Sequence, residues 1–292
     1  MTTENIQSQK KSRKPRNKWT HIFLRVMEYL LRNYKVQITP EYELYKEPMR
    51  IEIVIIKLLE DVIIKNTAMK FFKKHNVIEF KGPTDILNIE AFDRVLSYFY
   101  AYLSQNSLSL QDVALTFVSV KKPEKLFEIL KNNRKYKIVS AKANGIYYIK
   151  SITSPAIQLL VISELSAQDL IWIKAIRNDW TAQEGIEIVK RFESTGENKL
   201  LREVLYSLCT ANEDILEEVE KMTESKKVIK FLDSWAVRSG RAQTWMREAE
   251  QKGMQKGMQE GRQEERQRIF AILQQQGYDV NSIKSKLPRE FA

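Results

Sequence analysis

The chain is predicted to fold as an α/β protein in which helices flank a mixed sheet, followed by a helical C-terminal extension. Apolar residues recur with the period of a helix over residues 19–34 and 89–105. Short apolar runs typical of strands lie between and after these helices, at residues 35–45, 49–58, 76–81 and 113–120. The order helix, three strands, helix, strand indicates a mixed sheet with helices on both sides.

Composition limits the class of protein. At 292 residues the chain is long enough for one well-buried domain with extensions. A hydrophobic content of 43% and a charged content of 29% are typical of a globular protein rather than a disordered one. The net charge of +11 favours polyanionic partners, of which nucleic acid is the commonest. A basic protein without a nucleic-acid role is the alternative.

Few residues of the chain are suited to soft or borderline metals. Cys209 is the single cysteine, so an internal disulfide and a cysteine zinc cluster are excluded, and its place in a helical apolar pattern predicts a buried thiol. With only His21 and His75, a histidine-rich site is excluded too. No apolar run approaches the ~18 residues of a membrane span, and the N-terminus lacks the apolar core of a signal peptide. We expect no membrane partner and a reduced, cytoplasmic setting.

The chain is predicted to have four segments. Residues 1–18 form a basic, disordered arm, which either contacts a nucleic-acid backbone or keeps the chain soluble. The candidate DNA-contacting side chains of this arm are Lys11, Arg13, Lys14 and Arg16. Residues 19–165 form the core, residues 166–236 a helical part packed on it, and residues 237–292 a tail rich in glycine and charge.

Secondary elements within the core follow from turn and strand signals. Residues 46–48, with Pro48, predict a turn that joins the first two strands into a hairpin. A short helix is expected at residues 124–133, a second hairpin around Asn144 and Gly145, and one more strand at residues 155–163.

The tail repeats glycine every four residues, at Gly253, Gly257 and Gly261. Glycine costs about 0.8–1.0 kcal/mol relative to alanine inside a helix. Spacing by four aligns the glycines in one row, where a second helix can approach closely, so a homo-oligomer through the tail is one interpretation. A frayed helix is the other. Beyond it, residues 269–273 and 280–287 predict two short helices around Gly277.

Two charged residues near the end of the strand at residues 76–81 predict the chemistry. Glu79 and Lys81 are two apart, so both side chains point to one face of the strand, while Ile78 and Phe80 face the other. Glu52 stands inside another apolar run, where a carboxylate is costly to bury without compensation. Two carboxylates and a lysine on neighbouring strands suit metal-assisted phosphodiester hydrolysis.

Magnesium is the cation that these ligands fit best. Mg²⁺ prefers hard oxygen ligands and is held by one or two carboxylates, with water and substrate phosphates completing its shell. The predicted ligands are Glu52, Glu79 and the backbone carbonyl of Phe80, and Mn²⁺ is the substitute. Lys81 is predicted to orient or deprotonate the attacking water. The alternative is that Glu52 faces solvent and that Glu79 and Lys81 form an exposed pair worth under ~1 kcal/mol.

Three stretches, at residues 47–57, 72–83 and 85–92, resemble the PD-(D/E)XK nuclease superfamily. The residues on which this resemblance rests are Glu52 in Arg50-Ile51-Glu52-Ile53, the Glu79-Phe80-Lys81 tripeptide and Gly82-Pro83 after it. Within this superfamily the chain is most similar to the bacterial recombination-promoting nuclease and putative transposase branch, whose tails are similar to residues 253–266. The resemblance covers residues 19–165 well, although the signature itself is short.

The resemblance implies a restriction-endonuclease-like core and Mg²⁺- or Mn²⁺-dependent DNA endonuclease activity of low sequence specificity, related to recombination or transposition. Glu52, Glu79 and Lys81 would be the catalytic residues. Aspartate is usual at position 52, so the extra methylene of Glu52 makes weak or absent activity the alternative, with the protein retained as a DNA-binding or assembly module. Arg94 and Tyr98 resemble an accessory motif of this superfamily. They either contact a phosphate, as the remaining candidate DNA contacts, or only complete the packing of their helix.

Overall fold

The computed structural model describes residues 18–40, 53–60, 62–151, 154–166, 168–195 and 198–275. The chain divides into two compact units, residues 1–231 and 232–292. The boundary expected at residue 237 falls inside helix α8 (Lys226–Ser239). No helix among the described residues is long and apolar enough to cross a membrane.

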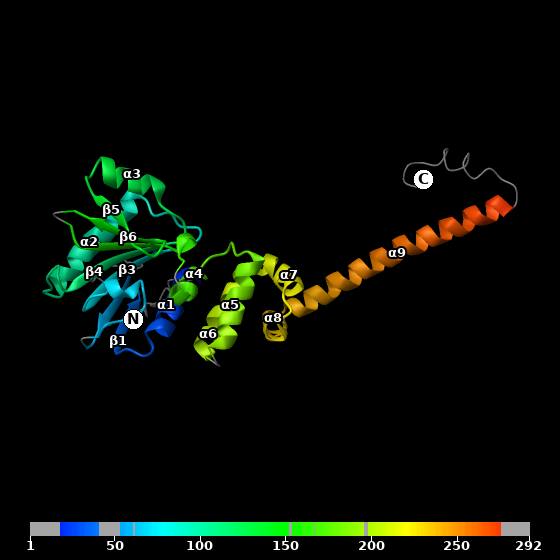
Figure 1. Ribbon diagram of the computed structural model, residues 1–292, viewed down its shortest axis with the longest axis horizontal. Coiled ribbons are helices and arrows are strands. Elements are labelled where there is room, and N and C mark those ends of the chain that lie inside the picture. Colours follow the sequence, from blue (N-terminus) through cyan, green and yellow to red (C-terminus); the bar gives the residue numbers. More distant parts are fainter. Residues whose placement is uncertain are drawn as a thin grey trace, which may run out of the picture. The chain divides into compact units, whose positions relative to one another are not determined.

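A seven-stranded mixed sheet forms the centre of the first unit, which confirms the predicted α/β class (Figure 1). Its strand order is β1-β2-β3-β4-β7-β6-β5. The strands are β1 (Val36–Pro40), β2 (Ile53–Leu58), β3 (His75–Lys81), β4 (Val113–Ser119), β5 (Lys137–Ser140), β6 (Ile146–Lys150) and β7 (Ile157–Val161). Strands β3, β4 and β7 are parallel, and the outer strands pair antiparallel.

Both predicted hairpins are present as antiparallel pairs. Val36 of β1 lies opposite Leu58 of β2, and the turn between these strands lies outside the described residues. Strands β5 and β6 pair around Gly145, whose φ of 77° is a conformation that favours glycine. The strand expected at residues 155–163 is shorter, because the chain turns into a 3₁₀ helix at Ile162–Glu164.

The helices of the first unit lie where apolar periodicity predicts helices near residues 19–34, 89–105 and 124–133, and several more fill the part after residue 166. They are α1 (Lys18–Leu31), α2 (Ile89–Gln105), α3 (Glu124–Asn132), α4 (Ile171–Lys174), α5 (Ala182–Ser194), α6 (Lys199–Ala211), α7 (Glu213–Met222) and the first part of α8. Helix α2 begins at a side-chain cap, because Asn88 Oδ1 accepts a hydrogen bond from the Ala91 N–H at 2.9 Å. Helix α5 begins with a capping box between Thr181 and Glu184.

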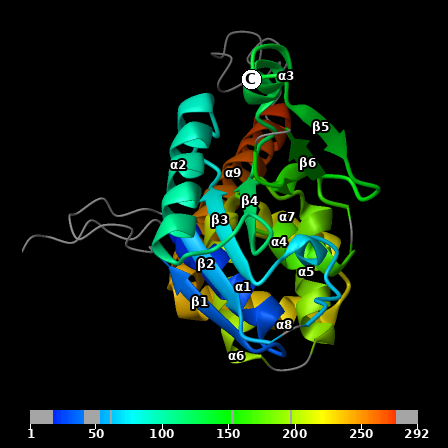
Figure 2. The ribbon, with the colours of Figure 1, turned by 90° about the vertical axis from the view of Figure 1, so that its left-hand side faces the viewer.

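Helices cover both faces of the sheet. On one face, α2 and α3 pack over β3, β4 and β7, and Phe92 of α2 stacks on Phe117 of β4 at 5.2 Å. On the other face, Phe23 of α1 stacks on Phe80 of β3 at 4.7 Å, and α4 contributes Ile173 to the same layer. Figure 2 shows α2 beside β2 and β3, and α3 next to the β5–β6 hairpin. Every residue of β3 is therefore buried, including the charged ones.

The second unit contains one long helix, α9 (Arg241–Gln275). The expectation of a separate short helix at residues 269–273 is wrong, because these residues continue α9 without a break. The segment at residues 280–287 lies outside the described residues. A Cβ atom added at Gly253, Gly257 or Gly261 would meet no atom within 4 Å, so none of the described residues packs on the glycine row. Association through that row stays a prediction.

The first residue of β3 predicts a pH-dependent stability. His75 is 5% exposed and its Nδ1 lies 2.7 Å from the Tyr102 hydroxyl. Burial lowers the pKa of His75, and nearby Lys57 and Lys74 lower it further, against the opposing effect of Asp112. The unfolded chain therefore binds more protons than the folded one below the ordinary histidine pKa of about 6.5. We expect the free energy of unfolding to fall as the pH drops from 7.5 through this value.

The measurement is urea denaturation at several pH values between about 7.5 and 5.5, above the range of most carboxylates. The matched control is His75→Gln, which removes the titrating group and is expected to flatten this slope. An equal slope in both proteins would assign the pH dependence to other groups.

Candidate active site

Glu79 and Lys81 form a buried ion pair near the end of β3. Lys81 Nζ lies 2.5 Å from Glu79 Oε1. Glu79 is 4% exposed and Lys81 is 9% exposed. The alternative of an exposed strand pair is therefore wrong, and the reason is that α2 covers the face to which both side chains point. Removing the lysine of such a pair takes away the cation nearest to a buried carboxylate, which is costly.

The register of the sheet holds both side chains on the α2 face. Glu79 lies between Ile53 of β2 and Phe117 of β4, and Lys81 lies beside Ser119. Ile53 and Phe117 belong to the apolar core under α2, so Glu79 projects into the same layer. The pair is therefore held by a central strand with a neighbour on each side.

The end of β3 is braced by a short turn. The Gly82 N–H donates to Asp85 Oδ2 at 2.9 Å. A Cβ atom at Gly82 would come within 3.1 Å of Trp19 Cβ, so α1 closely approaches this turn. Strands β3, β4 and β7 all end at this edge of the sheet, which is where ligands bind in many open parallel sheets.

The remaining predicted ligands lie around this pair or outside the described residues. Glu52 is outside them, and the first described residue of β2, Ile53, is directly opposite Glu79. Phe80, the predicted carbonyl ligand, lies between the members of the pair and points its ring to α1. The described residues contain no cluster of three or more histidine, cysteine, aspartate or glutamate side chains suited to a metal.

Two of the predicted DNA contacts, Arg94 and Tyr98, are among the described residues. Arg94 is exposed on α2 and forms no ion pair with any described residue, whereas Tyr98 packs against the core beneath this helix. Lys11, Arg13, Lys14 and Arg16 lie outside the described residues.

A second polar cluster, which the sequence did not single out, lies at the same edge of the sheet. Lys122 Nζ lies 3.3 Å from Glu164 and 3.4 Å from Glu124. The Tyr147 hydroxyl donates a short hydrogen bond to Glu164. The hydrogen bond with Glu164 raises the pKa of Lys122, and burial followed by the same carboxylate raises the pKa of Tyr147. At neutral pH the cluster thus contains a cationic lysine and a neutral tyrosine.

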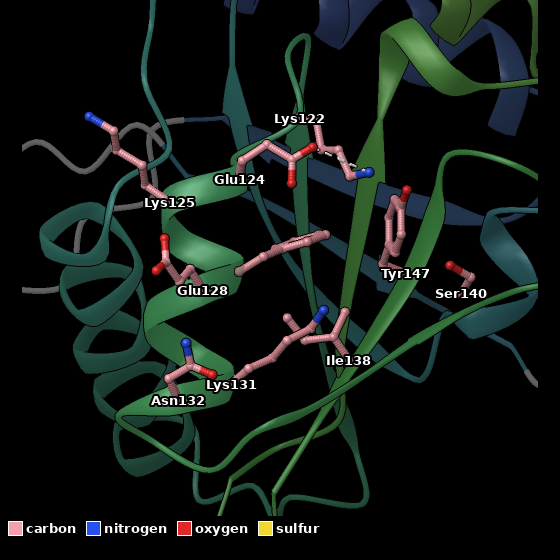
Figure 3. A pocket seen from close by; sticks show the side chains of 10 residues that line it. Lys122, Glu124, Lys125, Glu128, Lys131, Asn132, Ile138, Ser140 and Tyr147 are labelled. Atoms are coloured by element: carbon pink, nitrogen blue, oxygen red, sulfur yellow. Dashed lines mark ion pairs between the residues drawn. The ribbon is translucent and has the colours of Figure 1, made fainter.

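This cluster borders a pocket of about 600 Å³ between α3 and the β5–β6 hairpin (Figure 3). Tyr147 and Ser140 line it from the hairpin, and Lys122, Lys125 and Lys131 line it from α3 and the turn before it. Lys122 lies beside Tyr147, and Lys131 reaches from the end of α3 toward Ile138, whereas Lys125 points away from the hairpin.

The two polar sites share a face and a row of the sheet. Glu79 pairs with Phe117, Phe117 with Leu159, and Leu159 with Tyr147. Three interstrand spacings of 4.7–4.9 Å place Glu79 and Tyr147 about 14–15 Å apart. A backbone bond also connects the sites, because the Val120 N–H donates to the Lys81 carbonyl just before Lys121 and Lys122.

Comparisons with family models, with curated proteins and with solved structures found no match to this chain.

Proposed function

We propose that this protein is a divalent-metal-dependent DNA endonuclease of the PD-(D/E)XK type, with a restriction-endonuclease-like core. The observation that carries the proposal is the buried Glu79–Lys81 pair at the end of a central strand, on one face and 2.5 Å apart. The pair occupies the positions of the (D/E)XK element without substitution, and three parallel strands end beside it. A role in recombination or transposition belongs to the same proposal.

The residues present fit Mg²⁺ in kind. Glu79 offers a carboxylate and Phe80 a backbone carbonyl, both hard oxygen donors, and Glu52 would supply a second carboxylate. When bound, the metal would polarise a phosphate oxygen of the substrate and make a bound water more acidic. Lys81 holds its ammonium group beside the Glu79 carboxylate, where it orients a water or offsets charge on a phosphate oxygen.

The proposal makes a specific demand on Glu52. Ile53 lies opposite Glu79 and its side chain joins the core on the α2 face. Neighbouring side chains of a regular strand point to opposite faces. A metal shared by Glu52 and Glu79 therefore requires a departure from regular strand geometry between Glu52 and Ile53, of the kind that a β-bulge supplies next to active sites.

The test of this function is the nicking of supercoiled plasmid by purified protein in Mg²⁺, in Mn²⁺ and in EDTA. We expect nicking with either metal and none in EDTA. The matched variant is the double substitution Glu79→Gln/Lys81→Met, which removes both charges and keeps side chains of similar size. Nicking that persists in the variant would show that a contaminant or another site is responsible.

A second candidate function is a nuclease-like module that binds DNA without cleaving it. The observation that favours it is that Lys81 already neutralises Glu79, so the carboxylate is compensated without a metal. Binding of DNA in EDTA, together with no nicking in either metal, would support this function over hydrolysis.

A further inference from the structure

Most of the excess positive charge of the chain lies in one short segment of the first unit. Residues 121–150, which form α3, β5, β6 and their turns, contain nine lysines and arginines against two glutamates, a net charge of +7. The whole chain carries +11. About a tenth of the sequence thus contributes well over half of the net charge.

Seven of these cations are exposed and unpaired within the described part of the chain. Lys122 forms an ion pair with Glu164, and Arg134 forms a bidentate ion pair with Asp93. The other seven form no ion pair with a described residue. Five of them we call the basic surface: Lys121, Lys125, Lys131, Lys135 and Lys142.

Two of the seven lysines lie away from the candidate site. Lys137 and Lys150 are directly opposite each other in the β5–β6 pair, and they alternate with Ile138 and Ile149, which pack on the core under α2 and α3. Successive side chains of a strand point to opposite faces, so Lys137 and Lys150 point to the other face of the sheet. They are therefore not part of the basic surface.

We infer that the basic surface binds the phosphate backbone of duplex DNA and leads it to the Glu79–Lys81 pair. This inference rests on the proposed function for its substrate. Tyr147 lines the pocket beside Lys122 and lies about 14–15 Å from Glu79. This distance corresponds to about four base pairs of a duplex at 3.4 Å each, so one short duplex can contact both sites. Lys121 follows directly after Val120, whose N–H is bonded to the Lys81 carbonyl, so the surface reaches the edge of the candidate active site.

The chemistry of the segment favours nucleic acid over an anionic membrane. None of the exposed large apolar side chains of the described residues lies between residues 121 and 150, so the segment offers nothing to insert into lipid. Glu124 and Glu128 line the pocket between α3 and the hairpin. Because these two carboxylates repel phosphates, the DNA backbone contacts the exposed lysines around the pocket and does not enter it.

The experiment measures binding of a short fluorescent duplex by anisotropy in EDTA, where no metal-dependent cleavage takes place. The test variant is Lys121→Gln/Lys125→Gln/Lys131→Gln/Lys142→Gln. The matched control removes four exposed, unpaired lysines of α5, α6 and α8 in the same unit: Lys190→Gln/Lys199→Gln/Lys227→Gln/Lys230→Gln. We expect at least about tenfold weaker binding in the test variant, and a slope of log affinity against log salt that is smaller by about 3 to 4.

The control is expected to bind within about threefold of the wild type, because charges beyond a Debye length of ~10 Å are screened. Thermal unfolding checks that both variants fold. Equal losses in both variants, unchanged binding in the test variant, or displacement by polyglutamate as effective as by unlabelled duplex would overturn the inference. If the wild type nicks plasmid and the test variant binds DNA normally, the role of the basic surface is refuted and the nuclease function stands. If the basic surface binds DNA and the wild type does not nick plasmid, the nuclease function is refuted and the role of the surface stands.

Discussion

Replacing Lys81 by methionine is expected to lower the free energy of unfolding by about 3–5 kcal/mol and to abolish plasmid nicking. The substitution leaves the Glu79 carboxylate buried on the α2 face without the cation that lies 2.5 Å away in the wild type. Because domains of this size have stabilities of about 5–15 kcal/mol, the variant is expected to remain folded but to unfold at lower urea. Urea denaturation and the nicking assay measure the two effects separately.

The double variant Glu79→Gln/Lys81→Met separates stability from chemistry. A neutral pair of similar volume removes the buried carboxylate charge together with the cation that faces it, so most of the lost stability is expected to return while nicking stays absent. Nicking by the double variant would remove both residues from the mechanism. A Lys81→Met protein as stable as the wild type would contradict the burial of the pair.

Glu52→Asp is expected to raise the nicking rate, by up to about 100-fold if the longer side chain misplaces its carboxylate by about 1 Å. Aspartate is the usual residue of the superfamily that this sequence resembles, and glutamate places the same group one methylene farther from the backbone. The measurement is the initial nicking rate in Mg²⁺ at equal protein concentration.

Glu52→Gln is the matched control, because it keeps the length of the side chain and removes its charge. It is expected to eliminate nicking while DNA binding in EDTA stays unchanged. A rate for Glu52→Asp that is equal to or below that of the wild type would show that the site is built for glutamate. Nicking by Glu52→Gln would show that this carboxylate is not a ligand.

The secondary-structure elements that hold the candidate site could be predicted from the sequence. Helix α2 and strand β3 follow from their apolar patterns, and the alternation in β3 correctly assigned Glu79 and Lys81 to one face. The sequence did not predict that the pair itself is buried. Charged residues at alternate positions normally indicate a solvent-facing side, and only the tertiary packing of α2 on the sheet shows that the pair is buried.

The Lys122–Tyr147–Glu164 cluster was missed for a different reason. Its members come from the turn between β4 and α3, from β6 and from the 3₁₀ helix after β7, so the pairing of β6 with β7 is needed to bring them together. A local signal existed in the charge of residues 121–150, which stands out once charge is counted by segment rather than over the whole chain.

The glycine row of α9 has a consequence for how this helix opens. Gly253, Gly257 and Gly261 lie in a helix of 35 residues, and nothing among the described residues touches the positions where their side chains would be. Each glycine costs about 0.8–1.0 kcal/mol relative to alanine, so the row weakens two helical turns by about 2.5–3 kcal/mol in total. These turns are therefore the weakest part of the interior of α9, and their amide hydrogens should exchange with solvent sooner than those of the neighbouring interior turns.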